Sequence, residues 1–179
     1  MEGHAMRYMA KALLKGLMGG ESLTLSRLNH FSWLEIELKG TIIPVILTTD
    51  RGDLVEGKGQ LMGQYHYGDI PPGITVYALP KSHVASKETL ASLVHEIAHA
   101  LQGFHCGYSG DLLCSAQQEL YNEWYYSFSG AYAQASPLEA SAETFRYLMG
   151  YANSDDHWAT DPELLKAYAS FWKPILESL

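Results

Sequence analysis

Cysteines and long apolar runs are both scarce in this sequence. Its 179 residues include two cysteines, Cys106 and Cys114, which could form one local disulfide but are too few for a disulfide framework or a four-thiolate zinc site. No apolar run approaches the roughly 18 to 20 residues that cross a bilayer, since the run from Ile42 to Leu47 is interrupted by Pro44. The sequence therefore predicts no membrane-spanning segment and no membrane partner.

Positive charge is scarce as well. Twelve Lys and Arg residues stand against twenty Asp and Glu residues, which gives a formal net charge of -8. The basic side chains are scattered and the acidic balance repels phosphate backbones, so nucleic acid is not expected as a partner. Residues 6–18 lack a continuous apolar stretch and a small-residue cleavage site, so no signal peptide is visible.

The remaining composition is that of a globular domain. Hydrophobic residues make up 47% of the chain and charged residues 18%, without a low-complexity segment or an internal repeat. A chain of this length can bury a single hydrophobic core. We therefore predict one domain over residues 1–179, with one active site.

The first half of the sequence predicts a small β-sheet. Residues 31–38 and 41–48 are rich in β-branched and aromatic residues and are separated by a Lys-Gly pair, which is typical of a hairpin. Pro44 predicts that the second strand lies at a sheet edge. Residues 51–73, with many glycines, tyrosines and prolines, predict a long irregular loop before a short strand at 74–79.

Helical periodicity dominates the second half. Apolar residues recur every three or four positions between Lys87 and Gln102, and Ser86 can cap that helix. Ser136 followed by Pro137 marks another helix start. Helices are predicted at residues 7–18, 87–102, 112–126 and 136–149, with a linker at 127–135 and a last helix from Asp161 that Pro174 kinks or ends. These elements predict an α+β fold, a small sheet packed on helices.

The segment His95-Glu96-Ile97-Ala98-His99 matches the His-Glu-x-x-His pattern and lies inside the best-predicted helix. Four residues make about one helical turn, so both imidazoles project from one face toward a single ion. Glu96 lies beside them, where it can take a proton from an attacking water. The pattern predicts Zn²⁺ as the cofactor, with His95 and His99 as ligands; the alternative is a chance pair of surface histidines.

Catalytic zinc usually takes three ligands from the protein, so a third must lie downstream. Glu139 follows His99 by 40 residues (139 − 99), and Glu143 lies one turn further on the same helix face. A second, antiparallel helix could bring Glu139 to the metal and let Glu143 accept a hydrogen bond from a ligand imidazole. The alternative is that Glu139 only completes a capping box and Glu143 is a solvated surface carboxylate.

His105 is a rival third ligand. It follows His95 by ten residues (105 − 95), the spacing found in metzincins. That motif is incomplete here, because it requires glycine at Gln102 and a methionine turn that the sequence does not show. A surface histidine after a helix that ends at Gly103 is the simpler interpretation.

These residues together resemble the anthrax lethal factor-like metallopeptidases, a group that includes secreted Pro-Pro endopeptidases. The resemblance is carried by residues 95–101, by the segment Leu-Glu-Ala-Ser-Ala-Glu-Thr-Phe-Arg-Tyr-Leu-Met at 138–149, and by Tyr132, seven residues before Glu139. It covers about residues 74–150. The compact spacing between the two motifs is closer to the small endopeptidases than to the large toxin.

The resemblance implies a zincin-type metallopeptidase domain whose active-site core lies within residues 74–150. It implies that Glu139 is a zinc ligand, that Glu143 is a hydrogen-bonding neighbour of a ligand, and that Tyr132 is a proton donor or oxyanion stabiliser. It also implies a secreted, extracellular enzyme. Neither toxin activity nor Pro-Pro specificity is carried over.

The motifs therefore predict a zinc-dependent endopeptidase that hydrolyses a peptide or protein substrate. An extended substrate is expected to pair with the exposed edge of the strand at 74–79, with residues 64–68 as a candidate wall. Tyr125 or Tyr126 could take the place of Tyr132. Two other functions stay open, a zincin-like regulatory protein that cleaves a repressor and a catalytically silent zinc-binding module.

Overall fold

The computed structural model of this chain describes residues 33–38, 40–50, 52, 54–55, 59–60, 62–66, 72–78, 86–106, 115–128, 132–151 and 157–178. The helix predicted at 7–18 and Cys114 lie outside these residues. The strands are β1 (Trp33–Leu38), β2 (Thr41–Leu47), β3 (Leu54–Val55), β4 (Gly59–Gln60), β5 (Gly63–His66) and β6 (Gly73–Val76). The helices are α3 (Lys87–Cys106), α4 (Ser115–Trp124), α5 (Pro137–Leu148) and α6 (Pro162–Glu177), with short 3-10 helices η1 (Tyr125–Ser127) and η2 (His157–Thr160).

The main sheet has four strands in the order β1-β2-β6-β5. The predicted hairpin is confirmed: β1 and β2 pair antiparallel, and Gly40 in the turn adopts φ +77°, a conformation that glycine accepts without a Cβ clash. The edge position predicted for β2 is wrong, because β2 also pairs in parallel with β6. That second pairing covers residues 45–47 and begins one residue after Pro44, so the missing proline N–H does not interrupt it.

The irregular loop predicted at residues 51–73 is wrong in part. It contains the β3–β4 pair and β5, which is antiparallel to β6. In β5, Gly63 and Tyr65 are buried while Gln64 is exposed, so the strand alternates faces as half-buried strands do. Strand β5 was not predicted because it consists of glycine, polar and aromatic residues and has no β-branched residue.

Helices α3, α5 and α6 start as predicted, but α3 and α6 end elsewhere; α4, predicted from residue 112, starts at Ser115, and residues 112–114 lie outside the described part. Ser136 caps α5 and Asp161 caps α6, each followed by a proline in the first turn. Helix α3 continues through Gly103 to Cys106, which is disulfide-bonded. Helix α6 continues past Pro174 to Glu177, so that proline does not end it. The burial of Ile175 and Leu176 in the last turn outweighs the loss of one backbone hydrogen bond there.

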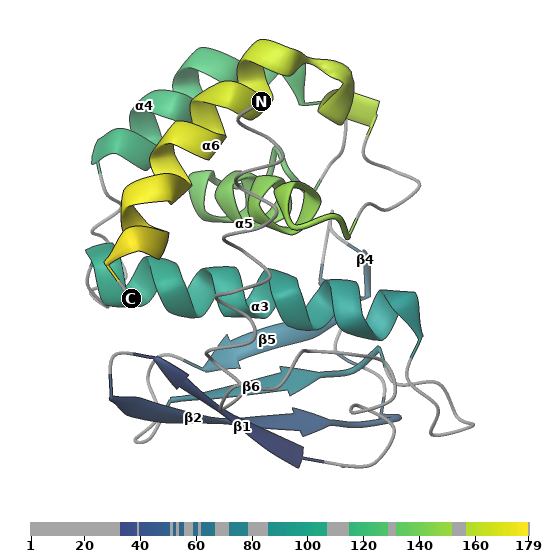
Figure 1. Cartoon of the computed structure of the whole chain (residues 1–179). Helices are drawn as coiled ribbons and strands as arrows, with labels where there is room; N and C mark the ends of the chain where they lie inside the picture. Colours follow the sequence, from purple (N-terminus) through teal and green to yellow (C-terminus); the bar gives the residue numbers. More distant parts are fainter. Residues whose placement is uncertain are drawn as a thin grey trace.

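Helix α3 forms the centre of the molecule. Figure 1 shows it lying across the sheet, with α5, α4 and α6 on its other side. Its apolar residues pack with the inner faces of the strands, and α5 packs on it and on α6, where the rings of Phe145 and Trp172 lie 4.6 Å apart. The predicted α+β class is confirmed, with a small mixed sheet and four α-helices among the described residues. In that part of the chain no helix is long and apolar enough to cross a membrane.

Candidate metal centre

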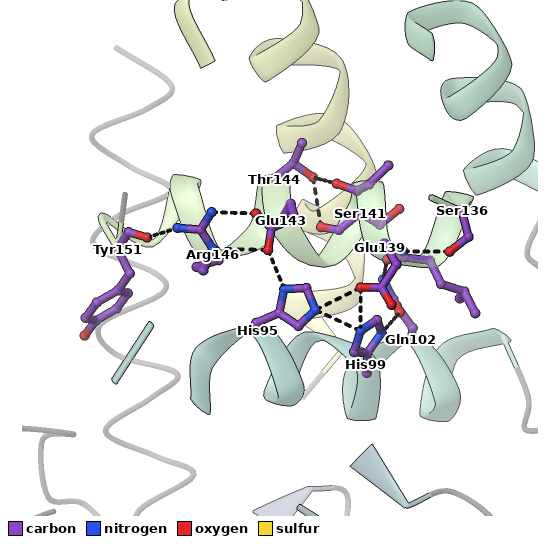
Figure 2. Close-up of polar contacts among 12 residues, drawn as sticks. His95, His99, Gln102, Ser136, Glu139, Ser141, Glu143, Thr144, Arg146 and Tyr151 are labelled. Carbon is purple, nitrogen blue, oxygen red and sulfur yellow. Dashed lines mark hydrogen bonds and ion pairs between the residues drawn. The ribbon is translucent and has the colours of Figure 1, made fainter. Parts of the chain in front are cut away.

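Helix α3 presents both histidines of the His-Glu-x-x-His segment toward α5. Their spacing of four residues places the rings on one face, with centroids 4.7 Å apart. His95 is only 5% exposed, and Figure 2 shows both rings pointing away from the sheet toward the carboxylates of α5. The interpretation as chance surface histidines is therefore wrong.

Helix α5 supplies two carboxylates from successive turns. Ser136 Oγ accepts the backbone N–H of Glu139 at 3.2 Å, which fixes Glu139 in the first turn of α5, and from there its side chain reaches across to α3. Its Oε2 lies 3.0 Å from His95 Nε2 and 3.4 Å from His99 Nε2. Glu143 contacts His95 Nδ1 at 2.7 Å from the other side of that ring. A capping role alone for Glu139 and a surface position for Glu143 are both excluded.

Three donor atoms converge on one point in this arrangement (Figure 2). His95 Nε2, His99 Nε2 and Glu139 Oε2 lie within 3.4 Å of one another, and the two Nε2 atoms are 3.0 Å apart. An ion that binds its ligands tetrahedrally at about 2.0 to 2.1 Å separates them by about 3.3 Å. The three residues could therefore hold a metal ion with little rearrangement.

Without a metal, His95 holds a proton strongly. Burial alone lowers the pKa of its imidazole, but hydrogen bonds to Glu139 and Glu143 outweigh burial and raise the pKa to about 10. Burial raises the pKa of Glu143, but its hydrogen bond to His95 and the charges of His95 and Arg146 outweigh burial and lower it to about 2. The metal-free protein at neutral pH thus has an imidazolium between two carboxylates, and a cation at this point would replace the proton on Nε2.

Metal binding is therefore expected to release a proton from His95. Because the pKa of His95 in the metal-free protein is raised to about 10, apparent metal affinity should rise with pH from 7 toward 10, by at most about tenfold per unit. The free energy that this ion pair adds to folding without the metal has the opposite pH dependence. It is fully present below pH 6.5, where the unfolded imidazole is also protonated, and it is lost as the pH approaches 10. Competition titrations with a chelator of known proton affinity would measure the slope.

The variant Glu143→Gln is a useful comparison for this slope. It removes one of the two carboxylates that raise the pKa of His95, so the slope should flatten at a lower pH. Calorimetry in buffers of different ionisation enthalpy would count the released proton directly. A wild-type affinity that stays constant between pH 7 and pH 9 would show that His95 is already neutral.

A buried arginine holds Glu143 in place. Arg146 is 1% exposed, and its guanidinium contacts Glu143 Oε2 at 2.6 Å while it also donates to the backbone carbonyl of Tyr151 (Figure 2). Arg146 donates to both carboxylate oxygens of Glu143, and Oε1 also contacts His95, so Glu143 has little freedom to rotate. The ring of His95 is fixed through this chain of contacts.

Glu96 follows His95 on α3, and its side chain lies against β5, where it interacts electrostatically with His95, His99 and Glu139. It is 4% exposed, and burial raises the pKa of its carboxyl even though His95 and His99 lower it. The backbone N–H of Tyr65 in β5 donates to it. A Cβ placed on Gly63 would lie 2.6 Å from Glu96 Oε1, so only glycine lets β5 approach this closely.

Tyr132 completes the group from the segment between α4 and α5. Its ring lies edge-on to that of His95, with centroids 5.8 Å apart. Burial raises the pKa of its phenol, and the charges of Glu139 and Glu96 raise it further, so Tyr132 keeps its proton. The alternatives Tyr125 and Tyr126 pack edge-to-face on each other instead, and Tyr126 is 93% exposed.

His105 takes no part in the cluster. Because α3 continues through Gly103, His105 lies in its last turn, exposed, about 120° around the helix from His99. A third histidine ligand of the metzincin kind needs the helix to break before it. The prediction of His105 as a rival ligand and the prediction that the helix ends at Gly103 are both wrong, because α3 continues to Cys106.

Gln102, Arg146 and Gly63 at this site were not singled out from the sequence. Gln102 and Arg146 follow His99 and Glu143 by three residues, a helical spacing that could have indicated them. Gly63 carries no such signal, because its role depends on how close β5 comes to Glu96.

Comparisons with protein-family models, curated proteins and solved structures find no match for this chain. What the site can do is inferred from its own side chains. Those of His95, His99 and Glu139 could hold a metal ion, with Glu96 and Tyr132 beside them.

Proposed function

We propose that this protein is a zinc-dependent endopeptidase of the zincin type. The observation that carries the proposal is the meeting of His95 Nε2, His99 Nε2 and Glu139 Oε2 within 3.4 Å of one another, with a buried glutamate next to them. A purely structural metal site would not need that additional carboxylate. The resemblance to the lethal factor-like metallopeptidases and the secreted location it implies stay predictions.

Zinc is the metal we propose for these ligands. Two imidazole nitrogens with one carboxylate oxygen form the donor set that catalytic zinc takes in several hydrolases, with the fourth position left for water or substrate. When bound, zinc supplies a Lewis acid that polarises a carbonyl and makes water more acidic. A hard ion such as Mg²⁺ prefers oxygen ligands and fits this set less well.

Glu96 is the residue we assign to proton transfer. Its carboxyl is held by the Tyr65 N–H and is therefore fixed in position, and burial raises its pKa, which makes it a stronger base than a solvated carboxylate. It takes a proton from the attacking water and returns it to the departing amine. Tyr132, protonated and beside His95, donates a hydrogen bond to the oxyanion that develops on the scissile carbonyl.

The substrate-binding edge we propose is that of β5. The exposed edge expected at residues 74–79 is absent, because β6 lies between β2 and β5. Among the described strands β5 pairs only with β6; a Cβ on its Gly63 would meet Glu96, and the Tyr65 N–H donates to Glu96. An extended peptide hydrogen-bonded along this edge would lie next to Glu96, as in other cases of strand addition.

A digest of a diverse peptide library tests the proposal. Protein loaded with zinc should cleave internal peptide bonds, and a chelator should abolish cleavage that added zinc restores. Cleavage sites read by mass spectrometry would also give the sequence preference. Zinc-loaded protein that cleaves nothing across the library would overturn the endopeptidase assignment and favour a silent zinc-binding module.

Replacing Tyr132 by phenylalanine should lower kcat by about 10²-fold or more, with KM little changed. The phenol hydrogen bond is made to the oxyanion and not to the substrate carbonyl, so its loss acts on the transition state. Steady-state kinetics on a peptide from the library digest would separate the two constants. Tyr126→Phe, at a 93% exposed position, is the control and should leave both constants unchanged. Equal kinetics for wild type and Tyr132→Phe would remove Tyr132 from the mechanism.

A further inference from the structure

Gln102 joins one histidine of the candidate centre to the first turn of α5. It lies one turn after His99 on α3 and is 2% exposed. Its Oε1 is 3.0 Å from His99 Nδ1, and its Nε2 donates to the backbone carbonyl of Leu138 at 3.1 Å. Figure 2 shows the amide between the His99 ring and the start of the helix that carries Glu139.

The Leu138 contact fixes which way the amide faces. A carbonyl oxygen only accepts hydrogen bonds, so the NH₂ group of Gln102 must point to it and the amide oxygen must point to His99. An amide oxygen also only accepts, so the proton of a neutral His99 ring lies on Nδ1. The lone pair of His99 then lies on Nε2, which faces His95 and Glu139.

We propose that Gln102 is a positioning residue that sets the tautomer of His99 and couples this ligand to the backbone beside Glu139. The inference rests on the proposed zinc centre, since it concerns how the ligands are held. A single amide reaches both sides of the site: His99 directly, and Glu139 through the carbonyl of the preceding residue, Leu138. Partners of this kind commonly contribute 10- to 100-fold in metal affinity.

A neutral partner on His99 also suits the charge of the site. The other ligand histidine, His95, already faces the carboxylate of Glu143, and Glu139 and Glu96 add two more. A carboxylate at position 102 would bring a fourth negative charge and could not donate to the Leu138 carbonyl. The amide is the one group of this size that accepts from the ring and donates to the helix backbone at once.

The test compares two buried glutamines of the same chain. Gln102→Met keeps the length of the side chain and removes both hydrogen bonds, and we expect it to weaken zinc binding by about 10- to 100-fold. Gln117 in α4 is fully buried without a partner for its Nε2, so Gln117→Met is the matched control and should leave the affinity within about twofold. Zinc dissociation constants come from competition with a chromophoric chelator.

A second variant separates the two roles of Gln102, which are positioning the His99 ring and linking α3 to α5 through the Leu138 carbonyl. Gln102→Glu keeps an acceptor for His99 and loses the donor to Leu138, so it should recover part of the zinc affinity lost in Gln102→Met. ¹⁵N spectra of labelled histidine should show the His99 proton on Nδ1 in wild type. A proton on Nε2, an unchanged affinity in Gln102→Met, or no recovery in Gln102→Glu would overturn the inference. Wild-type protein that binds no zinc would instead overturn the proposed function.

Discussion

Replacement of Glu96 by glutamine is expected to lower turnover by about 10² to 10⁴-fold while zinc binding is retained. The glutamine amide has nearly the same shape and can still accept the Tyr65 N–H, but it cannot take a proton from water. Glu96 lies outside the three metal-binding donors, so the zinc content should not change. Rates on a peptide from the library digest, with zinc measured in the same samples, check both statements.

The matched control for Glu96 is a carboxylate on the same helix. Glu88→Gln removes an exposed charge from the first turn of α3, about two helical turns before Glu96, and should leave turnover unchanged. A Glu96→Gln variant that keeps full activity would show that another group moves the proton. Loss of activity accompanied by loss of zinc would mean that the substitution disturbs the ligands, and the assigned role would not be supported.

The parts of the site that could be predicted are those set by local helix geometry. His95 and His99 lie on one face because a helix repeats every 3.6 residues, and the capping signal at Ser136 placed Glu139 in a first turn. The same rule covers Glu143, one turn further on. These positions could be predicted without knowing the geometry with which the helices pack against each other.

The parts that could not be predicted depend on distances between elements. Gly63 is needed because β5 lies against Glu96, and no spacing within the sequence reports that approach. The orientation of the Gln102 amide is set by its hydrogen bond to the Leu138 carbonyl, 36 residues away in the sequence. Sequence reasoning treated position 102 only as a missing glycine, and so it missed a partner of His99 that lies one helical turn from it.

Errors in the fold have a related cause. Three of them, at Pro44, Gly103 and Pro174, came from a residue with a strong local preference that tertiary packing overrode. Pro44 did not force an edge, because the parallel pairing with β6 starts just after it. Pro174 did not end α6, since Ile175 and Leu176 are buried in the turn that follows it. Gly103 did not end α3, where the partly buried Phe104 still packs against the core.

Removal of the Glu139 carboxylate should cost more zinc affinity than any change around the ligands. In Glu139→Gln, a neutral amide replaces the only charged donor of the three, and we expect the dissociation constant for zinc to rise by more than about 100-fold, the upper range for loss of an outer partner. The cap of α5 should survive, because Ser136 accepts the backbone N–H of residue 139 and not its side chain. Far-ultraviolet circular dichroism should therefore match wild type while metal titration and peptidase activity are lost.

The first turn of α6 offers the control for this change. Glu163 follows a capping Asp161 and a proline as Glu139 follows Ser136 and Pro137, but it is exposed and away from the cluster. Both substitutions to glutamine remove a favourable charge at a helix N-terminus, worth roughly 0.3 to 1 kcal/mol, so the difference between them isolates the contribution of the metal site. If Glu139→Gln and Glu163→Gln bind zinc equally well, Glu139 is not a ligand. The two histidines would then need another third donor, and the endopeptidase proposal would lose the geometry on which it depends.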